Sequence, residues 1–450
     1  MMLRRNRFAR TTVAALLAAG LAAPCVRAAD LPAPESWNAH VQSTWVWQDK
    51  PPFDAAYSGP YSLQPGRETG YSFSATAAFG VRAWQGAELY FDPEVVQGKT
   101  LSGLHGLGGM TNGEQQKTSG PNPTFYRARL FLRQTWDLAG GERQALASDM
   151  NQLAGSVAGR RLVLTAGNLA VSDLFDANAY AHDARSQFLN WALVANGAWD
   201  FAADARGYSW GAALEYDDGP WAVRAGRFLQ PAEANGLALD RRMFVHHGDQ
   251  VELERALDWA GAPGKLRLLA FHDRVRSGGF DDARRAAASA STPDVTQVRR
   301  ARGKTGFGLD AEQQLAATGP LADIGVFARA SWNDGKSETY AFAEIDRALS
   351  AGVNLAGTRW GRAQDAVGAA LAIDGLSGAH RAYLAAGGLG GFLGDGRLDY
   401  RSERIAEAYY RLDLGHGLQA TLDGQHIANP GYNRARGPVN VASVRLHAQY

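Results

Sequence analysis

One segment of the sequence alternates arginines and phenylalanines with other residues. In a β-strand, every second side chain shares a face, and guanidinium groups donate hydrogen bonds in a fixed planar fork. Aromatic rings on the same face would add apolar surfaces. Such a face suits contact with a small polar or anionic molecule. Within Phe125–Trp136 the residues on it are Phe125, Arg127, Arg129, Phe131 and Arg133.

The opposite face of this segment is mostly apolar. It carries Tyr126, Ala128, Leu130, Leu132 and Trp136. An arginine facing lipid costs roughly 2–4 kcal/mol near the bilayer midplane, so we expect the arginine face to point into the lumen of a membrane barrel and the apolar face to contact lipid. The same alternation elsewhere places further polar side chains in the lumen. These are Glu215, Arg329, Glu407, Tyr409 and Arg411.

A lumen with charges of both signs indicates a water-filled channel, because a dry core would require a partner for each buried polar group. Roughly sixteen or seventeen alternating segments follow one another, each about as long as a tilted transmembrane strand. The fold class predicted is all-β, a transmembrane antiparallel β-barrel, with sixteen strands preferred and eighteen as the alternative. Short turns such as Asp217–Pro220 alternate with long connections, predicted to be extracellular loops. Glu142–Gly155 has the composition of a short helix.

The connection from Ala170 to Arg206 is too long and too apolar for a simple exposed loop. It contains Phe175, Tyr180, Phe188, Trp191, Trp199 and Phe201. We expect it to fold into the barrel and narrow the pore, with Asp183, Arg185 and Trp191 among the constriction residues. The alternative is that it packs outside the barrel as a cap or an oligomer contact.

The N-terminus has the three parts of a secretory signal. Residues 1–10 are basic, Thr11–Val26 is apolar, and a small-residue cleavage site follows. We therefore expect residues 1–28 to be a signal peptide, cleaved after 28 or 29, and residues 29–450 to form a single barrel domain. Cys25 is the only cysteine, so a mature chain would have no disulfide, which a closed barrel does not need. The predicted location is the outer membrane of a Gram-negative bacterium.

The last strand also has the pattern of an outer-membrane barrel. Val444, Leu446, Ala448 and Tyr450 alternate with Arg445, His447 and Gln449. The first set is predicted to face lipid and the second the lumen. A terminal aromatic residue on such a strand resembles the signal by which barrel-assembly machinery recognises its substrates.

Three blocks of the sequence resemble the OprB-type carbohydrate-selective porins. They are Asn429–Pro438 leading into the last strand, Leu174–Trp191, and Asn151–Gly155 followed by Arg161–Gly167. This resemblance implies a sixteen-stranded barrel that passes glucose-like sugars. It assigns no constriction residues one by one.

Two short motifs match patterns of hydrolases and metal sites, but the residues around them do not fit either kind of site. Gly207–Gly211 matches a hydrolase G-x-S-x-G pattern, but it lies in an alternating segment with no helix after it. His246-His247 has no further ligands at metal-binding spacing. We therefore predict no catalytic residues, no metal and no cofactor. The net charge of +1 gives no support for nucleic acid as a partner.

The expected function is passive, carbohydrate-selective diffusion of small sugars. The alternatives are a general porin or one selective for anions or organic acids, which the lumen arginines would suit, and, from another class, an outer-membrane barrel enzyme. The expected partners are small sugars, outer-membrane lipid with lipopolysaccharide, the barrel-assembly machinery acting on the strand that ends at Tyr450, and a second copy of the chain in a homo-oligomer.

Overall fold

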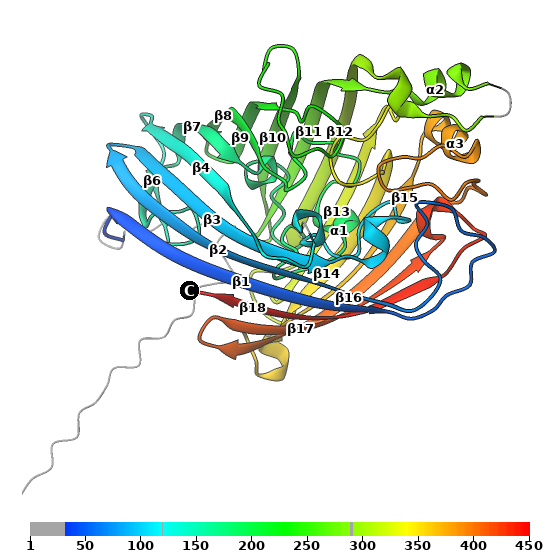
Figure 1. The fold of residues 1–450 in the computed structure, drawn as a ribbon. Coiled ribbons are helices and arrows are strands. Elements are labelled where there is room, and N and C mark those ends of the chain that lie inside the picture. The colour runs from blue at the N-terminus through cyan, green and yellow to red at the C-terminus, as the bar shows by residue number, and fades with distance from the viewer. Residues whose placement is uncertain (1–31, 119, 289–290) are drawn as a thin grey trace, which may run out of the picture.

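The computed structural model describes residues 32–118, 120–288 and 291–450. Sixteen antiparallel strands close into one barrel, with β1 paired to β2 on one side and to β18 on the other (Figure 1). The predicted count of sixteen is confirmed. The predicted signal peptide lies outside the described residues. The barrel strands are β1 Trp37–Lys50, β2 Glu68–Trp84, β3 Ala87–Lys99, β4 Thr124–Asp137, β7 Arg160–Leu169, β8 Ser209–Asp218, β9 Trp221–Leu229, β10 His247–Trp259, β11 Ala262–Ser277, β12 Arg300–Gln314, β13 Ile324–Asn333, β14 Arg347–Ala356, β15 Ala366–Gly375, β16 Glu403–Gly415, β17 Leu418–Ala428 and β18 Val439–Gln449. Two further strands, β5 Arg143–Leu146 and β6 Gly155–Ala158, lie outside the barrel sheet.

Strand alternation sets which residues line the barrel. In β16, Glu407, Tyr409 and Arg411 are buried inside, while the residues between them face outward. In β18, Arg445 and His447 are buried, while Leu446 is half exposed on the outside. These faces agree with the predicted ones. The charged interior and apolar exterior are the reverse of a soluble β-protein, as a barrel in lipid requires.

The two ends of the barrel differ in the length of their connections. One end has tight turns, such as the one between β8 and β9, where Gly219 has a φ of +60°. Outer-membrane barrels place such short turns in the periplasm. The other end carries the long loops and the helices α2 Phe280–Ala286 and α3 Gly378–Ala385, opposite the C-terminus (Figure 1). None of the helices in the described ranges is long and apolar enough to cross a membrane.

The connection between β4 and β7 differs from its prediction. Residues 142–155 were expected to form a short helix, but the chain here forms a two-stranded hairpin of β5 and β6, separate from the barrel sheet. Gly140 and Gly141 have φ near +90°, which a helix does not accept, and Asn151 makes a left-handed turn at the tip. Two hydrogen bonds hold the hairpin to the chain before β1: the Glu35 N–H donates to the Ala154 carbonyl at 3.0 Å, and the Ala154 N–H donates to the Glu35 carboxylate at 2.8 Å.

Apolar residues also pack inside the barrel, so part of the lumen is filled by protein and not by water. The connection between β7 and β8, residues 170–208, supplies Phe188 and Leu193, which pack with Phe327 and Tyr409 of the wall. The short helix α1 Trp191–Val194 lies within this connection. The predicted entry of this connection into the barrel is therefore confirmed. We call residues 170–208 the inward loop.

Candidate functional site: the lumen wall and the inward loop

The inward loop is attached to the wall by a buried ion pair. Arg329 of β13 donates from Nε to Asp176 Oδ1 at 3.0 Å and from Nη1 to the Leu193 carbonyl at 2.9 Å. The side chains of Arg329 and Asp176 are 2% and 1% exposed. Charges this deeply buried are tolerated only with close partners. Arg329 faces the lumen as predicted, and its position there anchors the loop.

The lumen face of β16 holds the same loop at other points. Glu407 accepts hydrogen bonds from the backbone N–H groups of Leu189 and Asn190 at 2.5 and 3.0 Å. Tyr409 meets the ring of Phe188 edge-on at 5.0 Å. Arg411 donates to the Ser186 carbonyl at 3.3 Å. The three predicted residues of this strand thus contact the loop directly, and all three are buried.

The loop residues predicted for the constriction are not equivalent. Arg185 donates to Glu94 at 2.9 Å and to Glu114 at 3.0 Å. Burial disfavours its charge, but these two carboxylates outweigh burial and raise the pKa of Arg185. Asp183 accepts from the backbone N–H of Arg185. Trp191 packs into an aromatic group with Phe201 and Phe342, at centroid distances of 6.1 and 5.4 Å.

The predicted faces of β4 are wrong in its first half. A β-bulge interrupts the pairing with β3, so that Asp92 lies opposite Arg129 while Pro93 lies opposite Arg127. The extra residue is Ala128, and its carbonyl accepts a hydrogen bond from Asn168 Nδ2 at 2.6 Å. Because side chains alternate with a period of two, one inserted residue reverses every face on one side of it.

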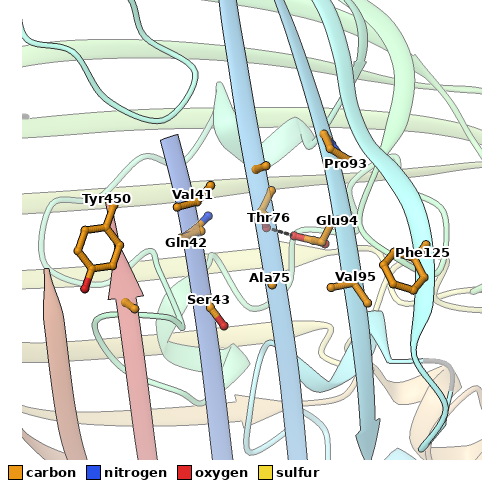
Figure 2. Close-up of a pocket in the computed structure, with 12 residues that line it drawn as sticks. Val41, Gln42, Ser43, Ala75, Thr76, Pro93, Glu94, Val95, Phe125 and Tyr450 are labelled. Atoms are coloured by element: carbon orange, nitrogen blue, oxygen red, sulfur yellow. Dashed lines mark hydrogen bonds between the residues drawn. The ribbon is translucent and has the colours of Figure 1, made fainter. Parts of the chain in front are cut away.

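Phe125 and Arg127 therefore face outward. Phe125 is 80% exposed and lines an outer groove with Val95 and Tyr450, whereas Glu94, hydrogen-bonded to Thr76, points to the other side of the sheet (Figure 2). The guanidinium carbon of Arg127 lies 5.1 Å from the ring centre of Trp210, an outward residue of β8. Neither residue belongs to the lumen. Tyr126 and Ala128, which were expected to face lipid, point inward instead.

After the bulge, β4 follows the prediction. Arg129 donates to both oxygens of Asp173, each at 2.7 Å, and lies 3.3 Å from Asp92. Phe131 stacks on Tyr90 with the centroids 4.9 Å apart. Arg133 lies 3.8 Å from Glu88. Arg129 and Arg133 are 14% and 26% exposed, so they keep contact with the lumen space.

The neighbouring strands continue this partly exposed wall. Glu215 of β8, predicted for the lumen, is 24% exposed and pairs with Arg224 of β9. Arg224 also donates to Glu252 at 2.9 Å. On β7, Arg161 lies 3.0 Å from Asp217. We call the lumen face of β4, β7, β8 and β9 the open wall, and that of β12 to β18, which holds most of the loop, the anchored wall.

A cluster of basic and tyrosine side chains borders the open wall, and the sequence prediction missed it. The rings of Tyr126 and Tyr208 lie 5.9 Å apart. Lys117 Nζ and the guanidinium of Arg129 each lie 5.4 Å from the ring centre of Tyr208. Glu94 accepts hydrogen bonds from both tyrosines, with Tyr208 at 3.1 Å. We call Lys117, Tyr126, Arg129 and Tyr208 the tyrosine cluster.

The electrostatics of this cluster are balanced. Burial disfavours the charge of Lys117, but Glu114, Tyr208 and Glu94 together outweigh burial and raise the pKa of Lys117. Burial likewise disfavours the charge of Asp173, and Arg129 outweighs it to lower the pKa of Asp173. Lys117 and Asp173 therefore both remain charged at neutral pH.

The sequence does contain a signal for the bulge in β4. Pro93 lies opposite the bulge, and proline inside a sheet is confined to edge strands and bulges.

Chemically, this region offers ring faces, cationic donors and carboxylate acceptors next to one another. Among the described residues, no group of three or more histidine, cysteine or acidic side chains has the arrangement to hold a metal ion. The arrangement suits reversible binding of a hydroxylated solute, in which ring faces cover C–H groups and charged groups exchange hydrogen bonds.

Solved structures share the fold. A high-pH structure of Pseudomonas putida OprB superposes with a TM-score of 0.69 at 16% identity, covering 92% of this chain and 94% of that one. A low-pH structure of the same protein gives a TM-score of 0.50 at 13% identity, over 92% and 93% of the two chains. The outer membrane channel DcaP of Acinetobacter baumannii gives 0.50 at 8% identity, over 92% and 97%.

No curated protein sequence matches the chain significantly. A model of the carbohydrate-selective porin OprB family, in contrast, matches residues 62–450. This match covers nearly all of the barrel, including the bulged strand β4, the inward loop and the last strand. The chain belongs to the OprB family of carbohydrate-selective porins.

Proposed function

We propose that the chain lets small, glucose-like sugars diffuse passively through its lumen, past the open wall and the tyrosine cluster. The observation that supports this most is the pairing of charges on the open wall. Arg129, Arg133 and Arg224 each lie beside a carboxylate. Paired charges give the wall little net field, so it favours a neutral solute with many hydroxyl groups over an anion.

The tyrosine cluster supports the same solute. A sugar ring has apolar C–H faces and a rim of hydroxyls. Tyr126 is partly exposed, and its ring neighbours that of Tyr208. The guanidinium of Arg129 lies 5.4 Å from the ring centre of Tyr208 and has donors to spare beyond its two acids. Stacking and charge-assisted hydrogen bonds together give selectivity without tight binding, which a conducting pore requires.

Liposome swelling tests this proposal. Purified protein in liposomes is exposed to equal osmolarities of glucose, sucrose and gluconate. We expect glucose to enter fastest, since it is small and neutral. Gluconate entering faster than glucose would favour the organic-acid alternative. Equal rates for solutes of similar size would favour a general porin.

We further propose that the protein is exported by cleavage after residue 28 or 29 and inserted into the outer membrane by barrel-assembly machinery acting on β18. The outward position of Tyr450, 58% exposed at the end of that strand, supports this. The apolar outer surface would contact lipid and lipopolysaccharide, and its grooves would accept a second copy in a homo-oligomer. Heat-modifiable migration of membrane fractions and cross-linking test these points, and a single monomeric band would exclude the oligomer.

A further inference from the structure

The hairpin between β4 and β7 enters the barrel from the short-turn end. Asn38 of β1 donates to Ser148 Oγ at 3.0 Å and to the Gln152 carbonyl at 2.8 Å. Gln449 of β18 donates to Asp149 at 3.1 Å. Asn38 lies on the lumen face of its strand, as the burial pattern of β1 shows. We call Ala147–Ala154 the hairpin tip.

The hairpin tip reaches the residues of the open wall. Asn151 Nδ2 donates to Asp92 Oδ2 at 2.9 Å, and the Asn151 carbonyl accepts from Arg133 Nη1 at 2.9 Å. The Leu153 N–H donates to the hydroxyl of Tyr90 at 3.1 Å, and Leu153 is 1% exposed. The φ of Asn151 is +57°, a conformation that asparagine adopts more readily than most residues.

Asp92 links the hairpin tip to the inward loop. The same oxygen that accepts from Asn151 lies 3.3 Å from Arg129 Nη1. The remaining edge of the Arg129 guanidinium is held by Asp173 of the inward loop. Arg129 is thus clamped between two carboxylates, one fixed by an element from each end of the barrel. Asp92 is fully buried, so its orientation depends on these few contacts.

We propose that the hairpin tip is the second wall of the constriction and that Asn151 is a positioning residue, which sets through Asp92 the direction in which Arg129 meets a passing sugar. This inference rests on the proposed function, because its readout is the interaction with sugar. The hairpin tip gives the pore two narrowing elements that meet at one arginine. Without the Asn151 donor, Asp92 loses one of the hydrogen bonds that fix its orientation. The orientation of Arg129 would then be set by Asp173 alone.

Planar-bilayer recording of the full chain tests the proposal with two variants and a control. Asn151→Asp keeps the side-chain shape but replaces the donor with a carboxylate beside Asp92, and Asn151→Gly keeps the positive φ but removes the side chain. Gln144→Ala is the control, because Gln144 is exposed on β5 and lies outside the hairpin tip. We measure conductance, the reversal potential in a salt gradient, and current block by glucose.

We expect both Asn151 variants to weaken glucose block by about two- to tenfold, which is the range for one lost hydrogen bond. Asn151→Asp should also shift the reversal potential towards cation selectivity, an effect that a merely structural role would not give. Gln144→Ala should match the wild type. Folding is checked by heat-modifiable migration, and if Asn151→Asp does not fold, Asn151→Gly alone decides.

The outcomes separate the two proposals. A wild-type channel that glucose neither blocks nor crosses would overturn the proposed function. A wild-type channel that glucose does block, together with folded Asn151 variants whose block and selectivity equal the wild type, would overturn the role of the hairpin tip and leave the proposed function standing.

Discussion

The two walls of the lumen use similar residues in different ways. On the anchored wall, Arg329 is 2% exposed and bonds to the inward loop. On the open wall, Glu215 is 24% exposed and pairs with Arg224 of the next strand. Arg133 is 26% exposed and contacts Glu88 and the Asn151 carbonyl of the hairpin tip. The same residue types are thus fully buried under the inward loop on one wall and partly exposed on the other, where Arg129 also bonds to Asp173 of the inward loop.

This difference teaches that an inward-facing charge in a barrel is not by itself a solute contact. What separates the two uses is how completely the inward loop covers the charge, from 2% exposure at Arg329 to 14% at Arg129. Buried charges must be paired where they lie, whereas partly exposed ones are solvated and contribute little to stability. The comparison therefore predicts large effects of loop and anchored-wall changes on pore size and stability, and smaller effects on solute selectivity from the open wall.

The largest expected effect comes from removing the part of the inward loop that holds Arg185 and Trp191. Deletion of residues 183–196 should raise single-channel conductance by about threefold or more, because the deleted segment occupies the lumen. The measurement is a bilayer recording of folded protein. Unchanged conductance would mean that the inward loop does not limit the pore.

The next effect contrasts one arginine from each wall. Arg329→Ala leaves Asp176 buried without its partner and should destabilise the folded protein by roughly 3–5 kcal/mol. Arg133→Ala, at a partly exposed site, should cost about 1 kcal/mol or less. The temperature of the heat-modifiable gel shift compares the two. If both variants lost the same amount of stability, the proposed difference between the anchored wall and the open wall would be wrong.

A smaller effect depends on pH at the loop end of the barrel. In α3, His380 lies 3.0 Å from Asp346 and 3.7 Å from Glu344. Burial opposes its protonation, but these two acids outweigh burial and raise the pKa of His380 to about 9. Because the unfolded value is about 6.5, the stabilisation is complete below that pH and is lost as pH rises through about 9.

Hydrogen exchange in residues 376–402, corrected for the intrinsic rate, should therefore show weaker protection at pH 10 than at pH 7.5. The difference is at most roughly 3 kcal/mol for the shift in question. His380→Gln should show weak protection at both pH values. Protection that does not change with pH in the wild type would contradict this role of the ion pairs.

The smallest expected effect is that of Arg127→Ala, which tests the bulge. Arg127→Ala should leave conductance and glucose block unchanged, because Arg127 faces outward against Trp210. Arg129→Gln, two positions away, should weaken glucose block by about tenfold, since hydrogen bonds to a charged group are worth roughly 1.5–3 kcal/mol. Block that weakens equally in both variants would place Arg127 in the lumen after all.

Most of the barrel was predictable because strand period alone fixes the faces of regular strands. Glu407, Tyr409 and Arg411 needed no knowledge of their neighbours to be placed in the lumen. The apolar content of residues 170–206 likewise predicted an inward loop, because a segment with that many aromatic residues must be covered.

The errors lie where a distant partner decides the structure. The bulge at Ala128 exists through pairing with Asp92 and Pro93 of another strand, so reading β4 alone reversed the faces of Phe125 and Arg127. The expected helix at 142–155 has suitable residues, but Asn38 and Tyr90 fix its backbone as a hairpin. The tyrosine cluster joins a strand and two loops, and no local pattern links them.

The most direct test of the central claim is the wild-type current in a planar bilayer with increasing glucose. If the open wall and the tyrosine cluster bind neutral sugars during passage, glucose should reduce the current in a saturable manner, and gluconate at the same concentration should block less. A current that glucose leaves unchanged, while gluconate blocks it saturably, would contradict the account.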